Sequence, residues 1–448
     1  MMTTTQTEKR MNWRGIAQVS LLNLAVTIII LPLDSTLNRI MINELGLSAS
    51  LVALLIALRF LTSPLRIWFG RYSDTHPING RFRVPYIAVG MVIMCAGFIL
   101  TPRAAFAIPD GGISALIFAI FAFGLLGLGV NMTTPLYFAI VSDQTEENQR
   151  SRIVAIMFIV LGVGVVISAA VIAAALDPYS NERLITIFYV VAGISLGMTL
   201  LGLLGLEPRR DDLSTAVSKT DEGSSFKVIR KLLVENKEVS RFFIYLVLTF
   251  VAVEAQEVIL EPYAAEAFGM TPAETTRLTA IFRTGLLITL AVGAWMVNRF
   301  GTHKTAVWGI YVTAVGFIMI IASGIVISSG IFMGGVLVIG LGAGMITIAN
   351  LTLMMNMTDD RNAGVYLGTW GFSQAVGVGG GTLIGGILRD VGAFVFSSSM
   401  GGYFVVYGLE IVLLIIAIPL IGQVNVSRFR ETTEKLTLVD AFGAAGAE

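Results

Sequence analysis

Long apolar stretches separated by short polar segments run through almost the whole chain. A helix that crosses a bilayer needs about 20 mostly apolar residues, because its backbone groups must be satisfied within the helix itself. By this criterion we predict twelve membrane-spanning helices, near residues 16–38, 48–70, 84–101, 113–141, 153–175, 184–206, 241–262, 278–298, 305–328, 331–355, 364–388 and 402–422. The polar N-terminal residues lead directly into a full-length span, which predicts that there is no cleavable signal. The pattern therefore predicts an all-α, multi-pass membrane protein.

The composition supports this interpretation and excludes several classes of protein. Of the 448 residues, 55% are hydrophobic and only 13% are charged, against about 25% charged in an average soluble domain. With 30 basic and 30 acidic residues the net charge is zero, so we expect no nucleic acid partner. One cysteine and two histidines provide neither a disulfide framework nor a metal-binding motif. Phosphate-loop and hydrolase motifs are also missing from the sequence, so we predict that the protein is not an enzyme.

The polar segments set the predicted orientation and domain limits. Most Lys and Arg residues fall in the N-terminal segment, in every second loop, in the central linker and in the C-terminal tail. The positive-inside rule places these parts in the cytoplasm, together with both termini. The predicted parts are an N-terminal six-helix bundle (1–206), a cytoplasmic linker (207–240), a C-terminal six-helix bundle (241–422) and a cytoplasmic tail (423–448).

The two halves of the chain look like repeats of one another. The loop GRYSDTHPINGRFR (70–83), between spans 2 and 3, corresponds in position to NRFGTHKT (298–305), between spans 8 and 9. In the same way SDQTEENQRSR (142–152) corresponds to MTDDRNAG (357–364). Six spans, a charged linker and six more spans form the plan of the major facilitator fold, in two pseudo-symmetric bundles.

The loop between spans 2 and 3 resembles the facilitator motif of a glycine, an aspartate and a basic cluster. An acid in such a loop can cap a neighbouring helix, while its arginines pair with acids on the facing bundle. These contacts would hold one side of the protein closed. We assign the following residues to this gating loop: Gly70, Asp74, His76, Arg81, Arg83, Asp143 and Arg152.

Several ionisable side chains fall inside predicted spans, where they are costly and therefore candidates for function. Asp34 and Asn38 are four residues apart, so they share a face at the outer part of the first span. Arg39 can neutralise either Asp34 or Glu44. A charge cluster that fixes the mouth of the span and a ligand site are equally open interpretations.

Three carboxylates of the seventh span have the spacing of a single helical stripe: Glu254, Glu257 and Glu261. Arg59, in the middle of the second span, is expected to pair with one of the first two. A proton relay would use such a stripe, but we favour structural pairing, in which Arg283 neutralises one of the last two acids. A further acid in the last span, Glu410, is expected to be hydrogen-bonded within its bundle.

Five stretches invite comparison with known families: STLNRIMINELGLSASLVALLIAL (35–58), GRYSDTHPINGRFRVPYI (70–87), SDQTEENQRSRIVAIMF (142–158), EVILEPYAAEAFGMTPAETTRLTA (257–280) and LGTWGFSQAVGVGGGTLIGGILRDVG (367–392). They resemble the PucC/LhaA-type proteins of photosynthetic bacteria, also called the bacteriochlorophyll delivery family. The chain departs from that pattern at Glu257, where we expect an aspartate, and at Arg59, where we expect a neutral residue.

The resemblance implies a role in assembling light-harvesting complexes. The protein would supply (bacterio)chlorophyll to antenna polypeptides or shepherd them, and its partners would be those polypeptides or the pigment-synthesis and assembly machinery. Its location would be the bacterial inner membrane, either cytoplasmic or intracytoplasmic and photosynthetic. The alternatives are a proton-coupled small-solute transporter, using Asp34, Arg59, Glu254 and Glu257, and a membrane chaperone that binds antenna helices without pigment.

A transient (bacterio)chlorophyll is the cofactor that this resemblance implies. Its magnesium accepts one axial ligand, usually an imidazole nitrogen or otherwise a hard oxygen donor. His76 and His303 occupy matching loops, which motif geometry explains more simply than two pigment sites. Within the membrane the ligand would be Asn38, Gln256, Gln374 or a water molecule.

The eleventh span is rich in glycine, which lets helices approach closely. Its smooth face suits a docked antenna helix or a flat macrocycle, although tight packing within the bundle is the simpler interpretation. Together with the three amide residues, the candidates for pigment or helix docking are Trp370, Gly379 and Gly380.

Overall fold

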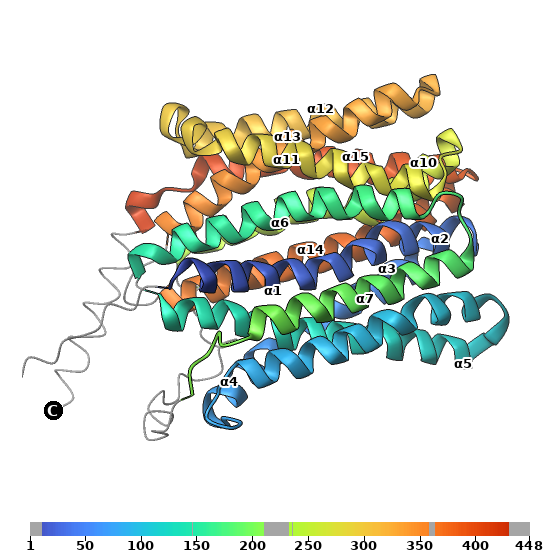
Figure 1. Ribbon diagram of the computed structural model, residues 1–448. Coiled ribbons are helices and arrows are strands. Elements are labelled where there is room, and N and C mark those ends of the chain that lie inside the picture. The colour runs from blue at the N-terminus through green and yellow to red at the C-terminus, as the bar shows by residue number, and fades with distance from the viewer. Residues whose placement is uncertain (1–10, 146, 210–232, 235, 358–362, 430–448) are drawn as a thin grey trace, which may run out of the picture. The chain divides into compact units, whose positions relative to one another are not determined.

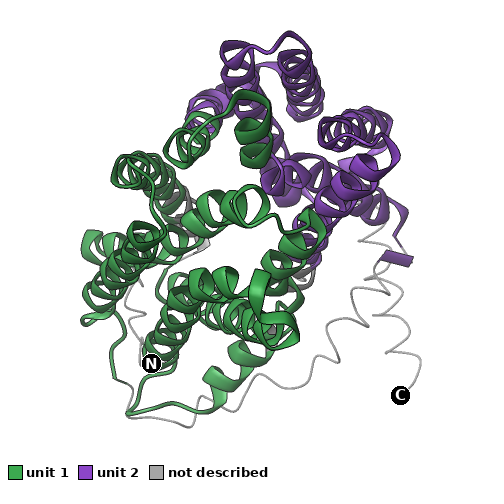
Figure 2. Ribbon diagram, turned by 90° about the vertical axis from the view of Figure 1, so that its right-hand side faces the viewer, with its two compact units in different colours: residues 1–220, 260–283 green, residues 221–259, 284–448 purple. Residues whose placement is uncertain are grey.

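The computed structural model describes residues 11–145, 147–209, 233–234, 236–357 and 363–429, most of which are helical (Figure 1). By its packing contacts the chain divides into two compact units, which are coloured separately in Figure 2. Unit 1 comprises residues 1–220 and 260–283, and unit 2 comprises residues 221–259 and 284–448.

Unit 1 contains the helices of the N-terminal half. They are α1 (Trp13–Pro32), the π-helix η1 (Leu33–Leu37), α2 (Asn38–Asn43), α3 (Ala49–Leu61), α4 (Leu65–Thr75), α5 (Val84–Gln144), α6 (Glu147–Ala175) and α7 (Asn181–Leu203). Side chains that accept a first-turn N–H group start several of them, as Asn12 does for α1, Ser48 for α3 and Ser180 for α7. The unit also takes in α10 (Leu260–Phe268) and the beginning of α11 (Pro272–Phe300).

Unit 2 contains most of the helices of the C-terminal half. They are α9 (Lys237–Glu254), the 3₁₀ turn η3 (Ala255–Val258), the remainder of α11, α12 (Thr302–Val326), α13 (Ser329–Asn356), α14 (Ala363–Val395) and α15 (Ser399–Gln423). Close glycine contacts join α12 to α13, because a Cβ atom at Gly342 would lie 2.5 Å from the backbone nitrogen of Thr313. Small residues at such points let helix backbones approach more closely than larger side chains allow.

The 61-residue α5 is a hairpin of two helical arms. Gly112 breaks the helix with φ 56° and ψ −142°, a backbone conformation that favours glycine. The arms then pack antiparallel, with Gly90 against Thr133 and Gly97 against the backbone of Leu126. The arms, 84–111 and 113–144, contain the predicted spans 84–101 and 113–141.

The multi-pass character predicted from the apolar stretches is confirmed. Among the described residues, nine helices are long and apolar enough to cross a bilayer, with the α5 hairpin counted once. A tenth is added if residues 237–258 and 260–268, which meet at a 43° bend, form one span. The apolar helix α3 has only 13 residues, which is short for a span on its own. The number twelve therefore stays a prediction.

The division by packing differs from the predicted domain limits at one segment. Residues 260–283 lie within the predicted C-terminal bundle (241–422), yet they pack with unit 1. The reason is local, since α10 contacts α2, and polar bonds from α2 reach Pro262 of α10 and Met270 in the turn between α10 and α11. The predicted bundles 1–206 and 241–422 remain a prediction.

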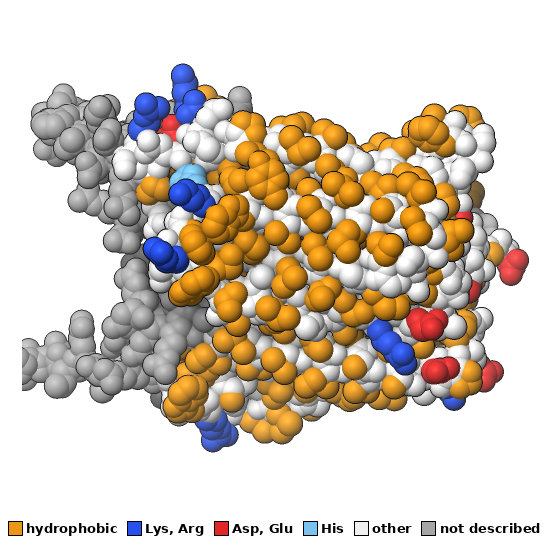
Figure 3. Space-filling view, turned by 90° about the horizontal axis from the view of Figure 1, so that it is seen from above, with side chains coloured by type: hydrophobic (Ala, Val, Ile, Leu, Met, Phe, Trp, Pro, Cys, Tyr) orange, Lys and Arg blue, Asp and Glu red, His pale blue; other side chains and the backbone are white. Residues whose placement is uncertain are grey.

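Hydrophobic side chains cover much of the outside of the protein. On the face seen in Figure 3 they fill the middle, while most Lys and Arg side chains lie toward one end and most Asp and Glu side chains toward the other. On α6, for example, Ile159, Val163 and Ile167 follow one another at four-residue spacing and are all exposed. An apolar outer band bounded by charged ends is typical of a protein surrounded by lipid.

Candidate functional site

An ion pair lies inside the helices of unit 1. Arg59 Nη1 on α3 donates to Asp34 Oδ1 on η1 at 2.5 Å, and the two side chains are only 8% and 19% exposed. The π-helical turn η1 carries Asp34, and turns of this kind are frequent at functional sites. The expected pairing of Arg59 with an acid is therefore found, with Asp34 as the partner. The predicted pairing with Glu254 or Glu257 would join the two units and stays a prediction.

A buried amide that the sequence reasoning missed extends this site. Asn131, on the second arm of α5, is fully buried and donates to the carbonyl oxygen of Arg59 and to Thr62 Oγ1, both at 2.7 Å. Its Oδ1 accepts from Arg66 Nε at 2.5 Å. The amide therefore connects the end of α3 to the beginning of α4. The sequence feature that could have revealed this residue is a single asparagine within the apolar run GLLGLGVNM. A polar side chain in a membrane span needs a partner, so such a residue is a candidate for a buried contact.

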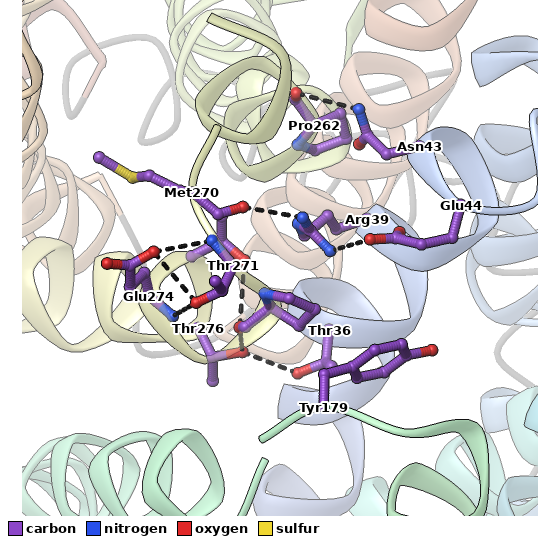
Figure 4. A network of polar contacts seen from close by, with 12 residues as sticks. Thr36, Arg39, Asn43, Glu44, Tyr179, Pro262, Met270, Thr271, Glu274 and Thr276 are labelled. Atoms are coloured by element: carbon purple, nitrogen blue, oxygen red, sulfur yellow. Dashed lines mark hydrogen bonds and ion pairs between the residues drawn. The ribbon is translucent and has the colours of Figure 1, made fainter. Parts of the chain in front are cut away.

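A second polar network joins α2 to the segment 260–276 within unit 1 (Figure 4). Arg39 forms an ion pair with Glu44, one of the two partners that the sequence left open, and its Nη2 donates to the carbonyl oxygen of Met270 at 2.8 Å. The hydroxyl groups of Thr36 and Thr276 lie 2.9 Å apart. These bonds connect η1 and α2 to the turn between α10 and α11 and to the beginning of α11.

The remaining polar groups at this end are also close to partners. Asn43 Nδ2 donates to the carbonyl oxygen of Pro262 at 3.4 Å, and Thr279 Oγ1 donates to Glu261 Oε1 at 3.2 Å. Asn38 is fully buried on α2. Burial raises the pKa of Tyr179, in the α6–α7 loop, to about 12, and the nearby Glu44 carboxylate adds to the rise. These contacts are consistent with a charge cluster that fixes the end of the first span. A ligand site there stays a prediction.

The three acids of the seventh predicted span do not share a regular helical stripe. The α-helix α9 ends at Glu254, and Glu257 follows in the 3₁₀ turn η3. Glu261 lies in the first turn of α10 after the bend, is 3% exposed and belongs to unit 1. The prediction of one stripe assumed a continuous α-helix, and it is wrong because the helical period changes at η3. Arg283 lies over the ring of Phe282, and its pairing with an acid stays a prediction.

The loop between α4 and α5 is organised around Arg83. Its guanidinium forms ion pairs with Asp74 and, at 3.5 Å, with Asp143. It also donates to Ser73 Oγ at 2.6 Å and to the carbonyl oxygen of Gly70 at 3.3 Å. Four of the predicted gating residues thus meet, and both acids lie in the same unit as the arginine. The loop arginines were expected to pair with acids of the facing bundle, whereas Arg83 pairs with acids of its own unit.

The acid that caps α5 is Glu207, at the start of the predicted linker. Its carboxylate accepts the backbone N–H groups of Phe82 at 2.8 Å and of Arg83 and Val84, both at 2.9 Å. It is 8% exposed, and its negative charge lies at the positive end of the helix. The sequence reasoning placed a capping acid in the loop itself and missed Glu207. The available signal was a lone acid immediately after the sixth apolar stretch.

The other predicted gating residues have local contacts. The ring of the exposed His76 stacks on Tyr72 at 4.2 Å, and the His76 carbonyl oxygen accepts from the Tyr86 hydroxyl at 2.5 Å. Arg81 pairs through its backbone with Ile78. The side chain of Arg152 lies outside the described residues. In the matching loop of unit 2, His303 Nε2 lies 2.9 Å from the carbonyl oxygen of Val424.

The glycines of α14 have two different surroundings. The glycines that face α9 and η3 pack closely against these elements. A Cβ atom at Gly385, for example, would lie 2.2 Å from the carbonyl oxygen of Ala255. The same holds at Gly377 and Gly381, in accordance with the simpler packing interpretation. Gly380, by contrast, has no atom within 4 Å of such a Cβ position.

The candidate pigment ligands differ in how accessible they are. Gln374 is exposed on α14, beside Gly371, which also has open space. Gln256 is buried on η3, and its Oε1 has no hydrogen-bond partner among the described residues. Trp370 is buried against the Phe242 ring, and Gly379 is buried too. Among the residues that the structure describes, no three His, Cys, Asp or Glu side chains form a metal cluster.

Comparisons with known proteins give a family and a fold. A family model described as PUCC protein matches residues 36–429. The chain is 31% identical over 418 residues to Protein PucC of Rhodobacter capsulatus, covering 90% of each chain. It is 28% identical to the bacteriochlorophyll synthase 44.5 kDa chain of the same species, covering 91% of this chain and 94% of that one.

Among solved structures, the crystal structure of the nucleoside transporter NupG matches with a TM-score of 0.67 at 13% identity. The match covers 92% of this chain and 99% of NupG. At this identity the likeness shows the fold alone. The predicted major facilitator type of fold is confirmed.

Proposed function

Because the chain belongs to the PUCC protein family, we propose that it is a non-enzymatic membrane factor for the assembly of photosynthetic light-harvesting complexes. The observation that carries the proposal is the family match over residues 36–429. A relative named as a chain of bacteriochlorophyll synthase adds support for a link to pigment. The protein would act in the bacterial inner membrane, with both termini in the cytoplasm, on antenna polypeptides or with pigment-synthesis machinery.

The exposed apolar face of α14 is the surface on which an antenna helix would dock. Gly380 lies between the exposed Val376 and Ile384, and exposed apolar residues continue at Ile387 and Val391. The spacing of three and four residues places them along one side of the helix. A glycine in the middle of an apolar face allows a second helix to approach closely. This surface supports the shepherding of a single-span polypeptide.

Gln374 is the residue that fits a delivered (bacterio)chlorophyll. A carboxamide oxygen is a hard donor that magnesium accepts. Gln374 is exposed on α14, whereas Gln256 and Asn38 are enclosed by packing. The pigment supplies the light-absorbing macrocycle, and Gln374 would hold it transiently through its amide oxygen until transfer.

Gentle purification from a phototrophic host tests the proposal. We expect (bacterio)chlorophyll in the absorption spectrum and in the extract, or antenna polypeptide bound to the protein. Gln374→Leu should remove the pigment, whereas the matched change at the exposed Gln423 should not. Pigment-free protein that retains antenna polypeptide would favour the chaperone alternative. If neither accompanies the protein, the assembly role is wrong.

Helix docking has its own matched pair of variants. Gly380→Leu should reduce the antenna polypeptide that accompanies the protein, because the bulky side chain prevents close approach. Gly197→Leu on α7 is the control, because Gly197 also has no atom within 4 Å of a Cβ position. Equal effects of the two variants would show that α14 is not the docking surface.

The second candidate function is proton-coupled transport of a small solute. It is favoured by the likeness to a transporter fold and by the Asp34–Arg59 pair within unit 1. Glu254→Gln or Glu257→Gln should then abolish proton-dependent uptake. Uptake assays in proteoliposomes, with the two variants beside the unaltered chain, distinguish this function from assembly.

A further inference from the structure

A carboxyl group without a charged partner lies in the middle of α15. Glu410 is 0% exposed, and it is the only charged residue in the helix. Its carboxyl group faces the backbone amide of Gln256 on η3. Neither oxygen meets the geometry of a hydrogen bond with any group that the structure describes. The expectation that Glu410 is hydrogen-bonded within its bundle stays a prediction, with the backbone amide of Gln256 as the facing donor.

The level of Glu410 along the helices follows from two close contacts of α14. Gly385 packs on Ala255 of η3, and Gly402 of α15 packs on the carbonyl oxygen of Arg389. Since α14 and α15 are consecutive antiparallel helices, Glu410 lies at about the height of Gly381, one turn before Gly385, where α14 packs on Val251 and on the backbone nitrogen of Ala255 at the start of η3. This is the point at which α9 loses its α-helical hydrogen bonding and bends.

The charged groups on the packed elements do not compensate a carboxylate at that height. α15 packs against α9, η3, α12 and α14. At the end of α9 and in η3 the charged residues are acids, Glu254 and Glu257. Among the cations of α9, Arg241 is the one nearest to this point. It pairs with Glu238 and lies about 20 Å from the end of α9 along the helix axis.

The other two packed helices offer no better partner. The charged residues of α14 are Arg389 and Asp390, which form an ion pair with each other at 3.1 Å. α12 carries His303 and Lys304 in its first turn and no Asp, Glu, Lys or Arg after them. On α15 itself, one turn from Glu410, the titratable neighbour is the buried Tyr407. No ion pair of Glu410 is present among the described residues.

We propose that Glu410 is a proton-binding site built into unit 2. An ionised carboxylate without water or a cation is strongly disfavoured, whereas the neutral acid is tolerated. In this packing the proton is held as the O–H of the carboxylic acid. Release breaks that O–H bond and passes the proton to water, so it requires α15 to part from η3. Proton occupancy thereby favours the packed arrangement of α9, η3 and α15. The inference does not depend on the proposed function.

Infrared spectroscopy of the purified protein in lipid nanodiscs tests this directly. We expect the carbonyl band of a protonated carboxylic acid at neutral pH, assigned by ¹³C-labelled glutamate. The band should vanish in Glu410→Gln and persist in Glu182→Gln, the matched change at an exposed acid of α7. A wild-type spectrum without the band at neutral pH overturns the proposal, and so does a band that Glu410→Gln leaves unchanged.

The pH dependence of unfolding gives a second measurement. A glutamate that is protonated when folded and ionised when unfolded makes unfolding easier as the pH rises. Near neutral pH, a rise of one pH unit should therefore increase the unfolding constant of the wild type. This increase should be about tenfold larger than the increase for Glu410→Gln. Equal slopes would overturn the proposal. If Glu410→Gln does not fold, the ¹³C-labelled wild-type spectrum alone decides.

Discussion

Removal of Asp34 should destabilise the protein by leaving a buried guanidinium without its carboxylate. Breaking one side of a buried ion pair costs about 3–5 kcal/mol. The Arg59 side chain is 8% exposed, but that of Asp34 is 19% exposed, so some solvent already reaches the pair. We therefore expect the lower end, about 3 kcal/mol, for Asp34→Ala. This corresponds to about a hundredfold change in the unfolding constant.

The double variant separates the charge effect from lost packing. Replacing a buried ion pair with apolar residues is often nearly neutral. Asp34→Ala combined with Arg59→Met should therefore be less destabilised than Asp34→Ala alone, by about 2 kcal/mol. The assay is equilibrium unfolding of the purified protein in mixed micelles of SDS, for wild type, both single variants and the double variant. Glu182→Ala, at an exposed acid, serves as the control and should stay within about 0.5 kcal/mol of wild type.

Two outcomes would refute this reasoning. If Asp34→Ala is as stable as Glu182→Ala, the guanidinium has found other compensation and the ion pair contributes little. If the double variant loses the sum of the two single losses, the side chains act independently, and their coupling energy is zero. Either result would remove the pair from the candidate functional site of unit 1.

Two further predictions concern the cap of α5 and the glycines of α14. Glu207→Ala removes the acceptor of three backbone N–H groups, so we expect a loss of about 2 kcal/mol in the same unfolding assay, with Glu207→Gln intermediate. A Glu207→Ala variant as stable as Glu182→Ala would contradict this. Gly385→Ala places a methyl group 2.2 Å from the carbonyl oxygen of Ala255 and should cost about 1–3 kcal/mol. Gly380→Ala, in open space, should instead stabilise its helix by up to about 1 kcal/mol, and shifts of the same sign at both glycines would refute the contrast.

The sequence by itself determined the class of the protein and most of its helices. Apolar runs of about 20 residues are sufficient to identify spans, because a bilayer leaves the backbone no other way to satisfy its hydrogen bonds. The separation of the third and fourth spans was also predicted, since 84–101 and 113–141 were assigned as two spans, and the structure places the break at Gly112. The family followed from short stretches spread over both halves of the chain.

The partners of the polar side chains were decided only by the tertiary structure. Sequence spacing shows which residues share a helix face, but not which helix lies opposite, so Arg59 could not be assigned to Asp34, or Asn131 to Arg66. Local backbone form mattered as well, because the 3₁₀ turn η3 interrupts the α-helical period of Glu254, Glu257 and Glu261. The assignment of Glu207 to the start of α5 joins positions more than 120 residues apart in the chain. Contacts of this kind depend on how helices pack, and packing is a property of the folded chain rather than of any local stretch.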